Sequence, residues 1–211
     1  MTGAEVDSVV YIVDDSREVR DSLVVLFATH GIRSHAFSSA DEFLGECSPA
    51  VRGCTIVDIR MPEVSGFILH QRMREQGYTL PVIMVSGHGD VEMAVRALKA
   101  GALDFIQKPY RSRDMIRAVR HALEVDARDH VRRLQEETVL ARLALLNDRE
   151  RRILRLISEG LYNKVIADRL GLSISTVEAN RKQIVRKLRA GSLYDLIRMD
   201  DLDRTRHRPR E

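Results

Sequence analysis

The sequence predicts an α/β module with a doubly wound, five-stranded parallel sheet, joined by a long helix to an all-α helix-turn-helix module. Short apolar runs alternate with helical patterns over roughly the first 120 residues, which favours parallel strands connected by helices. Residues 110–159 contain neither glycine nor proline, as a long helix requires. Beyond them a short helix, a glycine and a basic helix follow one another, an order typical of a helix-turn-helix.

The composition is that of an ordinary soluble globular protein, since 44% of the 211 residues are hydrophobic and 31% are charged. No apolar run approaches the roughly 20 residues that span a bilayer, and no leader signature opens the chain. We therefore expect a cytoplasmic protein that does not associate with a membrane. Cys47 and Cys54 form no CxxC motif, so neither a zinc site nor a disulfide scaffold is indicated.

Charge is distributed unevenly along the chain. Residues 1–124 carry 14 Lys and Arg against 17 Asp and Glu, a net charge of −3. Residues 125–211 carry 20 against 14, a net charge of +6. The second part is therefore suited to a polyanion, and a solvated basic surface is the alternative explanation of its charge.

Each predicted strand of the first module is a short apolar run. Strands are expected at residues 9–13, 32–37, 54–57, 81–85 and 103–107. Helical patterns with caps or glycine stops lie between them, at residues 18–30, 39–47, 66–76 and 90–100. Asp90 is the expected cap of the last of these helices, and the nearby His88 is expected to have a surface or steric role rather than an acid–base one.

Chemically reactive side chains stand where four of these strands end. Asp14 and Asp15 follow the first strand, Asp58 the third, Ser86 the fourth and Lys108 the fifth. The carboxyl ends of parallel strands meet at one edge of a doubly wound sheet, so these residues are expected to converge. Singly, each has a plain alternative: a turn-capping aspartate, a turn-forming hydroxyl or an ion-paired lysine.

Together these residues fit phosphoryl transfer to a carboxylate. Carboxylates attract a hard cation that prefers oxygen ligands, so Asp14 and Asp15 are expected to hold Mg²⁺. Asp58 would be the nucleophile, and the Lys108 ammonium would stabilise charge on the transferred phosphoryl group. Ser86 offers a hydroxyl that can bond the new phosphate.

The connector carries a helical stripe of apolar residues, and residues 124–145 are predicted to continue the fifth helix of the first module. An ordinary helix followed by a loose linker is the alternative. A dimeric coiled coil is left open, because Asp126, His130 and Thr138 interrupt a strict heptad.

The second module is expected at residues 146–199. Asn147 and Glu150 form a capping signature for its first helix, and Gly171 permits a turn after the second. Ser173 or Ser175 caps a third, basic helix. Residues 200–211 lack a sustained apolar pattern and are predicted to be a disordered tail.

The strand-end residues, with Met61-Pro62 after Asp58 and Pro109 after Lys108, resemble the flavodoxin-like receiver domain of two-component response regulators, and residues 86–105 are FixJ-like. The resemblance implies that a sensor histidine kinase phosphorylates Asp58. It also implies that Mg²⁺ is held by Asp15, Asp58 and the backbone carbonyl of Arg60, with Asp14 acting through water. Ser86 and Phe105 would be the switch residues. Phe105 has no hydroxyl, so burial of its ring would drive the switch.

Residues 146–199 resemble the LuxR-type DNA-binding domain. The resemblance makes 176–189 the recognition helix and 192–199 a dimer-forming helix. The residues that it brings to double-stranded promoter DNA are Glu178, Ala179 and Lys182 at bases, Arg181 and Lys187 at phosphates, with Arg186 further along the helix and Asn180 where histidine is common.

The chain is accordingly interpreted as a transcription regulator that forms a homodimer on phosphorylation. It is not expected to be an enzyme, since it would take part only in its own phosphorylation and dephosphorylation. Two alternatives stay open: a Mg²⁺-dependent phosphatase of the aspartyl-phosphate kind, and a dimeric DNA-binding protein that needs no phosphorylation. The phosphatase is disfavoured because Arg60 stands where such enzymes have a second acid.

Overall fold

A computed structural model of the protein describes residues 8–87 and 91–207, so His88 and the expected cap Asp90 lie outside the described residues. The chain divides into two compact units, residues 1–130 and 131–211. Each unit is built around its own hydrophobic core. The module boundaries that the sequence indicated at residues 123 and 145 stay predictions.

The first unit contains a five-stranded sheet in the order β2-β1-β3-β4-β5, and every neighbouring pair is parallel. This confirms the predicted fold class. The order reverses between β1 and β3, which is where open α/β sheets form their ligand crevice. The strands are β1 Val9–Val13, β2 Ser34–Phe37, β3 Gly53–Asp58, β4 Val82–Ser86 and β5 Asp104–Gln107.

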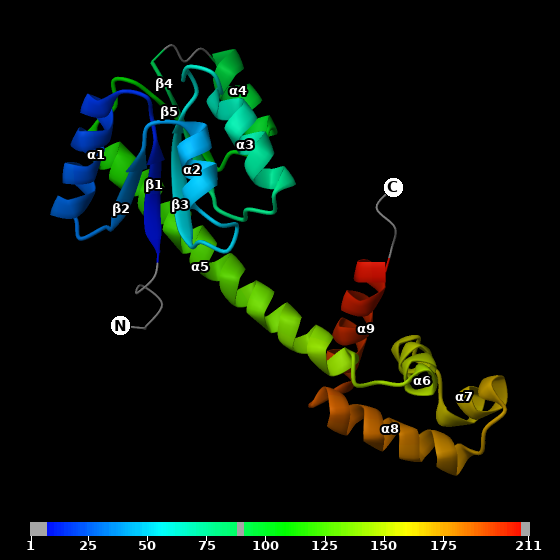
Figure 1. Ribbon diagram of the computed structural model, residues 1–211. Coiled ribbons are helices and arrows are strands. Elements are labelled where there is room, and N and C mark those ends of the chain that lie inside the picture. Colours follow the sequence, from blue (N-terminus) through cyan, green and yellow to red (C-terminus); the bar gives the residue numbers. More distant parts are fainter. Residues whose placement is uncertain (1–7, 88–90, 208–211) are drawn as a thin grey trace. The chain divides into compact units, whose positions relative to one another are not determined.

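Helices cover both faces of this sheet (Figure 1). One face packs against α1 and α5 and the other against α2, α3 and α4, as the two core clusters show. Serine side chains accept from backbone N–H groups at the starts of α1, α2 and α3, as the sequence led us to expect for the second of these. The helices are α1 Arg17–Thr29, α2 Ala40–Glu46, α3 Gly66–Glu75, α4 Val91–Lys99 and α5 Ser112–Leu143.

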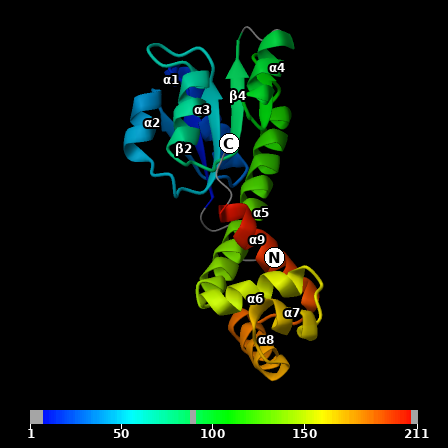
Figure 2. The same cartoon turned by 90° about the vertical axis from the view of Figure 1, so that its right-hand side faces the viewer.

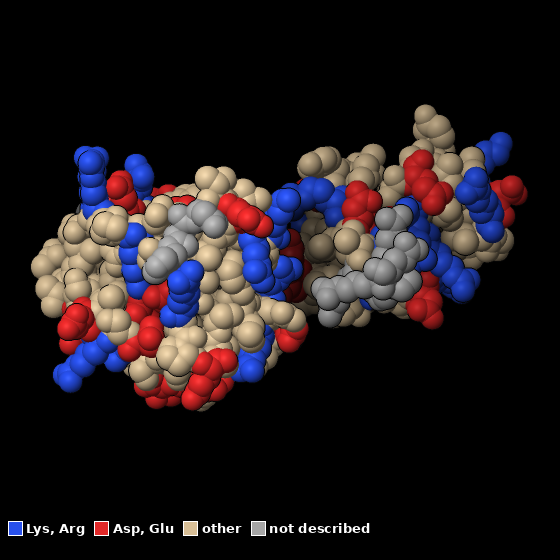
Figure 3. Space-filling model, turned by 90° about the horizontal axis from the view of Figure 1, so that it is seen from above, with Lys and Arg blue, Asp and Glu red and all other residues tan. Residues whose placement is uncertain are grey.

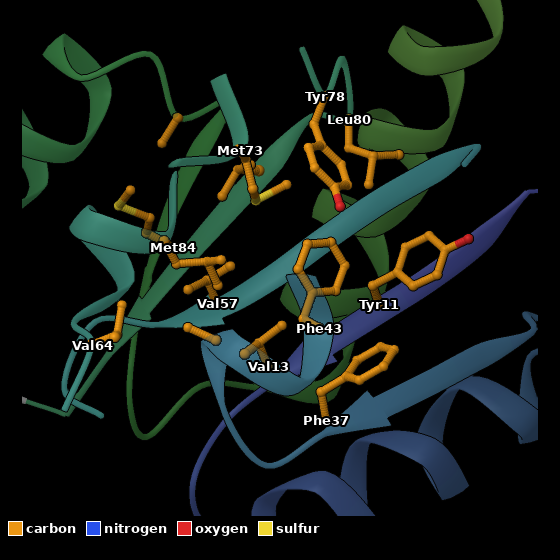
Figure 4. Packing of buried hydrophobic residues seen from close by; sticks show 14 of the residues in the cluster. Tyr11, Val13, Phe37, Phe43, Val57, Val64, Met73, Tyr78, Leu80 and Met84 are labelled. Atoms are coloured by element: carbon orange, nitrogen blue, oxygen red, sulfur yellow. The ribbon is translucent and has the colours of Figure 1, made fainter. Parts of the chain in front are cut away.

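Aromatic rings fill the core on the α2 side of the sheet (Figure 4). The Phe43 ring lies 5.4 Å from Phe37 and 5.9 Å from Tyr11, both in edge-to-face arrangements that aromatic pairs favour. Tyr78 closes the cluster, and its hydroxyl donates to the carbonyl of Cys47. The cysteine thiols are buried, as expected for packing residues.

A buried carboxylate joins α5 to the sheet. Asp126 accepts from the backbone N–H of Gly53 at 3.0 Å and from the Arg52 guanidinium at 2.8 Å. The sequence showed Asp126 only as an interruption of a heptad. Its partners lie more than 70 residues away, and for that reason the local pattern could not explain it.

The described part of the second unit contains helices and no strand, in agreement with the predicted class, and α6, α7 and α8 lie together with α9 (Figure 2). The last turns of α5 contribute to the same core through Leu143. Asn147 and Glu150 form the expected capping box, and Gly171 ends α7 with φ 64°. Of the two candidate caps for α8, the structure selects Ser173. The helices are α6 Asp148–Ser158, α7 Asn163–Leu170, α8 Ile174–Leu188 and α9 Leu193–His207.

The prediction of a disordered tail from residue 200 is wrong as far as residue 207, because α9 continues to His207. Asp200 and Asp203 are buried, and each has a basic partner. Asp203 accepts from the Arg151 guanidinium at 3.1 Å, and Arg204 lies 2.8 Å from Asp200. Charge pairing with α6 thus orders a segment whose composition looks solvated. Residues 208–211 lie outside the described residues.

Candidate functional site

The acidic pair after β1 is held by its own backbone. The Asp14 side chain is buried and accepts from the N–H of Ser16 at 2.9 Å, whereas Asp15 is exposed. The Arg20 guanidinium donates to the carbonyls of Asp14 at 2.7 Å and Asp15 at 3.0 Å. Arg20 was not identified from the sequence. It lies one helical turn into α1, and its role depends on a turn geometry that the pattern does not reveal.

Asp58 stands at the end of β3, and only 8% of the residue is exposed. One carboxylate oxygen, Oδ1, accepts from the N–H of Arg60 at 3.0 Å. After the loop that follows β3, the backbone at Gly66 passes close to that of Asp58. A Cβ on Gly66 would lie 2.5 Å from the Asp58 carbonyl oxygen. A glycine at the start of α3 therefore allows the helix to begin directly beside the acidic strand end.

Lys108 binds two carboxylates at once. Its Nζ lies 2.6 Å from Asp58 Oδ2 and 2.7 Å from Asp14 Oδ2. Burial lowers the pKa of Lys108, but the hydrogen bonds and charges of the two carboxylates outweigh burial and raise it. The lysine therefore stays protonated and neutralises one of the negative charges around it.

The three carboxylates form one cluster. Oxygen atoms of Asp14, Asp15 and Asp58 lie within 4.8 Å of one another. Burial raises the pKa of Asp14, and the charge of Asp58 raises it further against the opposing effect of Lys108. Three carboxylates facing a single ammonium leave excess negative charge. An all-oxygen cluster of this kind suits a divalent cation such as Mg²⁺.

The two expected switch residues lie on neighbouring strands. Ser86 is fully buried at the end of β4, and its carbonyl accepts from the N–H of Lys108 at 2.8 Å. Phe105 lies on β5 opposite Met84 and packs, half-buried, against the core cluster that includes Ala97 of α4. The ring of Phe105 thus lies where β5 meets α4.

The helix α8 presents the predicted base-reading residues to solvent. Glu178 and Ala179 are exposed in its first two turns, and Lys182 and Arg186 are exposed further along. Lys and Arg are interspersed with Asp and Glu over the face of the molecule seen in Figure 3.

The remaining polar candidates on α8 have partners inside the unit. Arg181 donates to Asn163 Oδ1 at 3.0 Å, and Asn180 donates through Nδ2 to the carbonyl of Thr176 at 2.7 Å. The N-terminus of α7 is thereby joined to α8. A DNA role for either residue stays a prediction.

Lys187 forms an ion pair within the unit. Its Nζ lies 2.6 Å from the buried carboxylate of Glu150 and 3.1 Å from the carbonyl oxygen of Leu145. Burial raises the pKa of Glu150, but Lys187 and the N–H of Asn147 outweigh burial and lower it. Lys187 thus connects α8 to α6, and its predicted contact with a DNA phosphate is untested.

No helix within residues 8–87 and 91–207 combines the length and the apolar character needed to cross a bilayer.

Two protein families match this chain. Residues 10–120 match the response regulator receiver domain, and residues 144–200 match the bacterial regulatory proteins of the luxR family. The first match covers the sheet and the carboxylate cluster. The second covers α6, α7 and α8.

Several known proteins are similar over most of their length. The response regulator TmoT of Ectopseudomonas mendocina is 39% identical, over 92% of this chain and 89% of its own. The transcriptional regulatory protein FixJ of Azorhizobium caulinodans is 40% identical over 90% of both chains. Among solved structures, the response regulator StyR has a TM-score of 0.80 at 33% identity and covers 92% of this chain and 98% of its own. Full-length FixJ from B. japonicum has a TM-score of 0.56 at 32% identity, over 94% and 98%.

Proposed function

Because the chain belongs to the two-component response regulators that join a receiver domain to a LuxR-type DNA-binding domain, we propose that phosphorylation of Asp58 by a sensor histidine kinase controls its binding to promoter DNA. Members of this family regulate transcription. One observation carries the proposal: Lys108 Nζ lies 2.6 Å from Asp58 Oδ2 and 2.7 Å from Asp14 Oδ2 at one edge of the sheet. A nucleophile, its charge-stabilising cation and a second acid are thereby assembled in one place.

The proposed transfer forms a bond between a carboxylate oxygen of Asp58 and phosphorus. It breaks the phosphorus–nitrogen bond of a phosphohistidine on the kinase. The electron pair of the broken bond stays on the imidazole nitrogen, which takes up a proton. Lys108 stays protonated throughout and binds a phosphoryl oxygen in place of the carboxylate oxygen that it binds before transfer.

Receiver domains use an acidic pocket for Mg²⁺, and the cluster described above fits that ion because all of its ligand atoms are oxygens. We assign Asp15, Asp58 and the backbone carbonyl of Arg60 as direct ligands, and Asp14 as a support through water. When bound, Mg²⁺ neutralises charge on the phosphoryl oxygens. Asp14 also anchors Lys108, so it joins the metal side of the site to the ammonium side.

Phosphorylation of Asp58 replaces its single carboxylate charge by the nearly two negative charges of a phosphoryl group beside buried Ser86. The Ser86 hydroxyl moves to donate to a phosphoryl oxygen, and the space that it leaves is filled by the Phe105 ring. Phe105 lies on β5 and packs against the core cluster that includes Ala97 of α4, so its burial changes the α4–β5 face. That face carries the exposed apolar side chains Val91 and Leu98, and we propose that it pairs with a second copy of the chain.

Pairing of receivers brings two DNA-binding units together on half-sites about one helical turn apart. Glu178 and Ala179 are exposed in the first two turns of α8, where recognition helices meet base edges, and Lys182 is exposed on the next turn. Glu178→Ala is expected to relax base preference at one position of the half-site by about 1–3 kcal/mol. Selection of binding sites from random DNA measures this change. An unaltered preference would remove Glu178 from the base contacts.

The phosphorylation step is tested with acetyl phosphate and Mg²⁺, followed by mass spectrometry of the intact protein and its peptides. Wild type and Asp21→Asn, a control at an exposed carboxylate on α1, should each gain one phosphoryl group. Asp58→Asn should gain none, and chelation of Mg²⁺ should prevent the gain in wild type and Asp21→Asn. Phosphorylation of Asp58→Asn at the wild-type rate would refute the assignment.

A further inference from the structure

The last turns of α5 have two different faces within the second unit. Val139, Leu140 and Leu143 lie on one face and pack into the core of the unit. The opposite face carries Val131, 51% exposed, and Leu134, 48% exposed. Single exposed apolar residues are normal on a protein surface. Whether this face of α5 is an interaction surface therefore depends on how its exposed residues are spaced.

Exposed positions on this face, three of them apolar, follow a heptad. Val131, Leu134, Thr138 and Ala141 are separated by three, four and three residues, and all four are exposed. This is the a–d–a–d order of a two-stranded coiled coil, with β-branched residues at a and leucine or alanine at d. The Thr138 hydroxyl donates to the carbonyl of Leu134 at 2.8 Å, so its hydrogen-bonding capacity is used within the helix. Thr138, an apparent interruption in the sequence, is therefore compatible with the seam.

We propose that this seam, residues Val131, Leu134, Thr138 and Ala141, pairs with the same seam of a second copy of the chain as a parallel coiled coil. The proposal deepens the phosphorylation-dependent dimer proposed above and rests on it. It adds a second dimer contact, on α5, to the one proposed for the α4–β5 face.

Charge at the flanking positions selects a second copy in parallel orientation. Glu137 occupies a g position and Arg142 an e position, five residues later. Parallel pairing places Glu137 of one copy beside the partner's Arg142 on each side of the seam. Arg142 keeps donors for this contact, since within residues 8–87 and 91–207 only one of its nitrogens is engaged, at 3.3 Å from the carbonyl of Leu188. Antiparallel pairing of the same seam would set Glu137 against the partner's Glu137, which is unfavourable.

The seam is short, and this gives it a regulatory property. Two heptads bury less than the roughly 1,000 Å² that a stable protein interface usually needs. The seam is therefore expected to remain open in the free monomer and to close when paired receivers raise the local concentration of one α5 near the other. Closing it fixes two DNA-binding units at one separation, which paired receivers on a flexible linker could not do.

Cysteine cross-linking of the full chain tests the geometry. Leu134→Cys lies at a d position, where partner side chains meet, whereas Glu136→Cys lies at an f position on the far side of the helix. With beryllofluoride and Mg²⁺, Leu134→Cys should form disulfide-linked dimers at least about tenfold faster than Glu136→Cys. Both native cysteines are buried, and burial raises the pKa of each thiol, so they react slowly. Equal rates for the two variants would overturn the proposal.

A gain-of-function variant provides a second test that misfolding cannot imitate. Thr138→Ile with Ala141→Leu places preferred residues at a and d, and should tighten the dimer at least about tenfold in light scattering, even without beryllofluoride. If wild type dimerises with beryllofluoride but the variant is no tighter and Leu134→Cys does not cross-link, the seam is wrong and the proposed function stands. If the variant dimerises while wild type never responds to beryllofluoride, the seam is supported and phosphorylation-dependent pairing fails.

Discussion

We predict how much the ion pair between Glu150 and Lys187 contributes to the unfolding free energy of the second unit. Glu150→Gln removes the carboxylate charge while keeping an oxygen that can accept from the N–H of Asn147, as glutamine does in capping boxes. Glu150→Ala removes the charge and the cap together. Comparison of the two variants therefore separates the ion pair from the helix cap.

The expected size of the effect follows from exposure. The Glu150 side chain is 3% exposed and that of Lys187 is 26% exposed, so the pair lies between a surface pair and a fully buried one. Surface pairs contribute up to about 1 kcal/mol, whereas breaking a buried pair costs about 3–5 kcal/mol. We expect Glu150→Gln to cost about 2 kcal/mol of unfolding free energy. Glu150→Ala should cost about 1 kcal/mol more, through the lost cap.

The pH dependence has a definite sign. The pKa of Glu150 is lowered in the folded protein, so its stabilisation is complete above the ordinary glutamate pKa of about 4.3 and is lost as pH falls through the lowered value. Wild type and Glu150→Gln should therefore differ fully at pH 7 and converge in acid. A difference that stayed constant below pH 4 would place the effect outside this carboxylate.

Hydrogen exchange at pH 7 measures the change where it occurs. Amides of α6 and α8 should lose protection in Glu150→Gln, and those of the first unit should be unchanged, because the units have separate cores. Equal protection of α8 in wild type and Glu150→Gln, within about 0.5 kcal/mol, would refute the reasoning.

Three further substitutions test other contacts. Gly66→Ala should destabilise the first unit by about 1–3 kcal/mol, because its Cβ would lie 2.5 Å from a backbone oxygen, whereas Gly45→Ala, with nothing within 4 Å, should be neutral or stabilising in a thermal melt. Lys108→Gln should strengthen Mg²⁺ binding severalfold in calorimetry while slowing phosphorylation, since it removes a cation held by two carboxylates; weaker Mg²⁺ binding would contradict this. Arg151→Ala should cost about 2 kcal/mol and expose residues 200–207 to protease, because it releases Asp203; an intact α9 would contradict its role.

The carboxylate site was predictable because parallel-sheet topology determines where strand ends meet. Asp14, Asp58 and Lys108 are far apart in sequence, yet each follows an apolar strand, and three such strands bring them within hydrogen-bonding distance. The sequence did not show that Lys108 donates hydrogen bonds to both acids at once. Residue types at strand ends indicate convergence, but the choice of partners depends on loop conformation.

Contacts between distant charged residues were the part that local pattern could not predict. Asp126 pairs with Arg52, 74 residues away in the sequence, and Asp203 pairs with Arg151, 52 residues away. A charged residue in a polar stretch looks solvated when its partner is unknown, and for this reason the end of α9 was predicted as tail. Lys187 was likewise predicted to contact a DNA phosphate, and the sequence did not show that it pairs with Glu150.

The central claim is that phosphorylation of Asp58 brings two chains together on DNA. The most direct test measures molar mass and DNA affinity of the full chain with and without beryllofluoride and Mg²⁺, on sites selected from random DNA by the treated protein. Wild type should double in mass and bind DNA at least about tenfold more tightly, with Asp58→Asn unresponsive in both. An equal response of Asp58→Asn, or DNA binding by wild type that ignores beryllofluoride, would contradict the account.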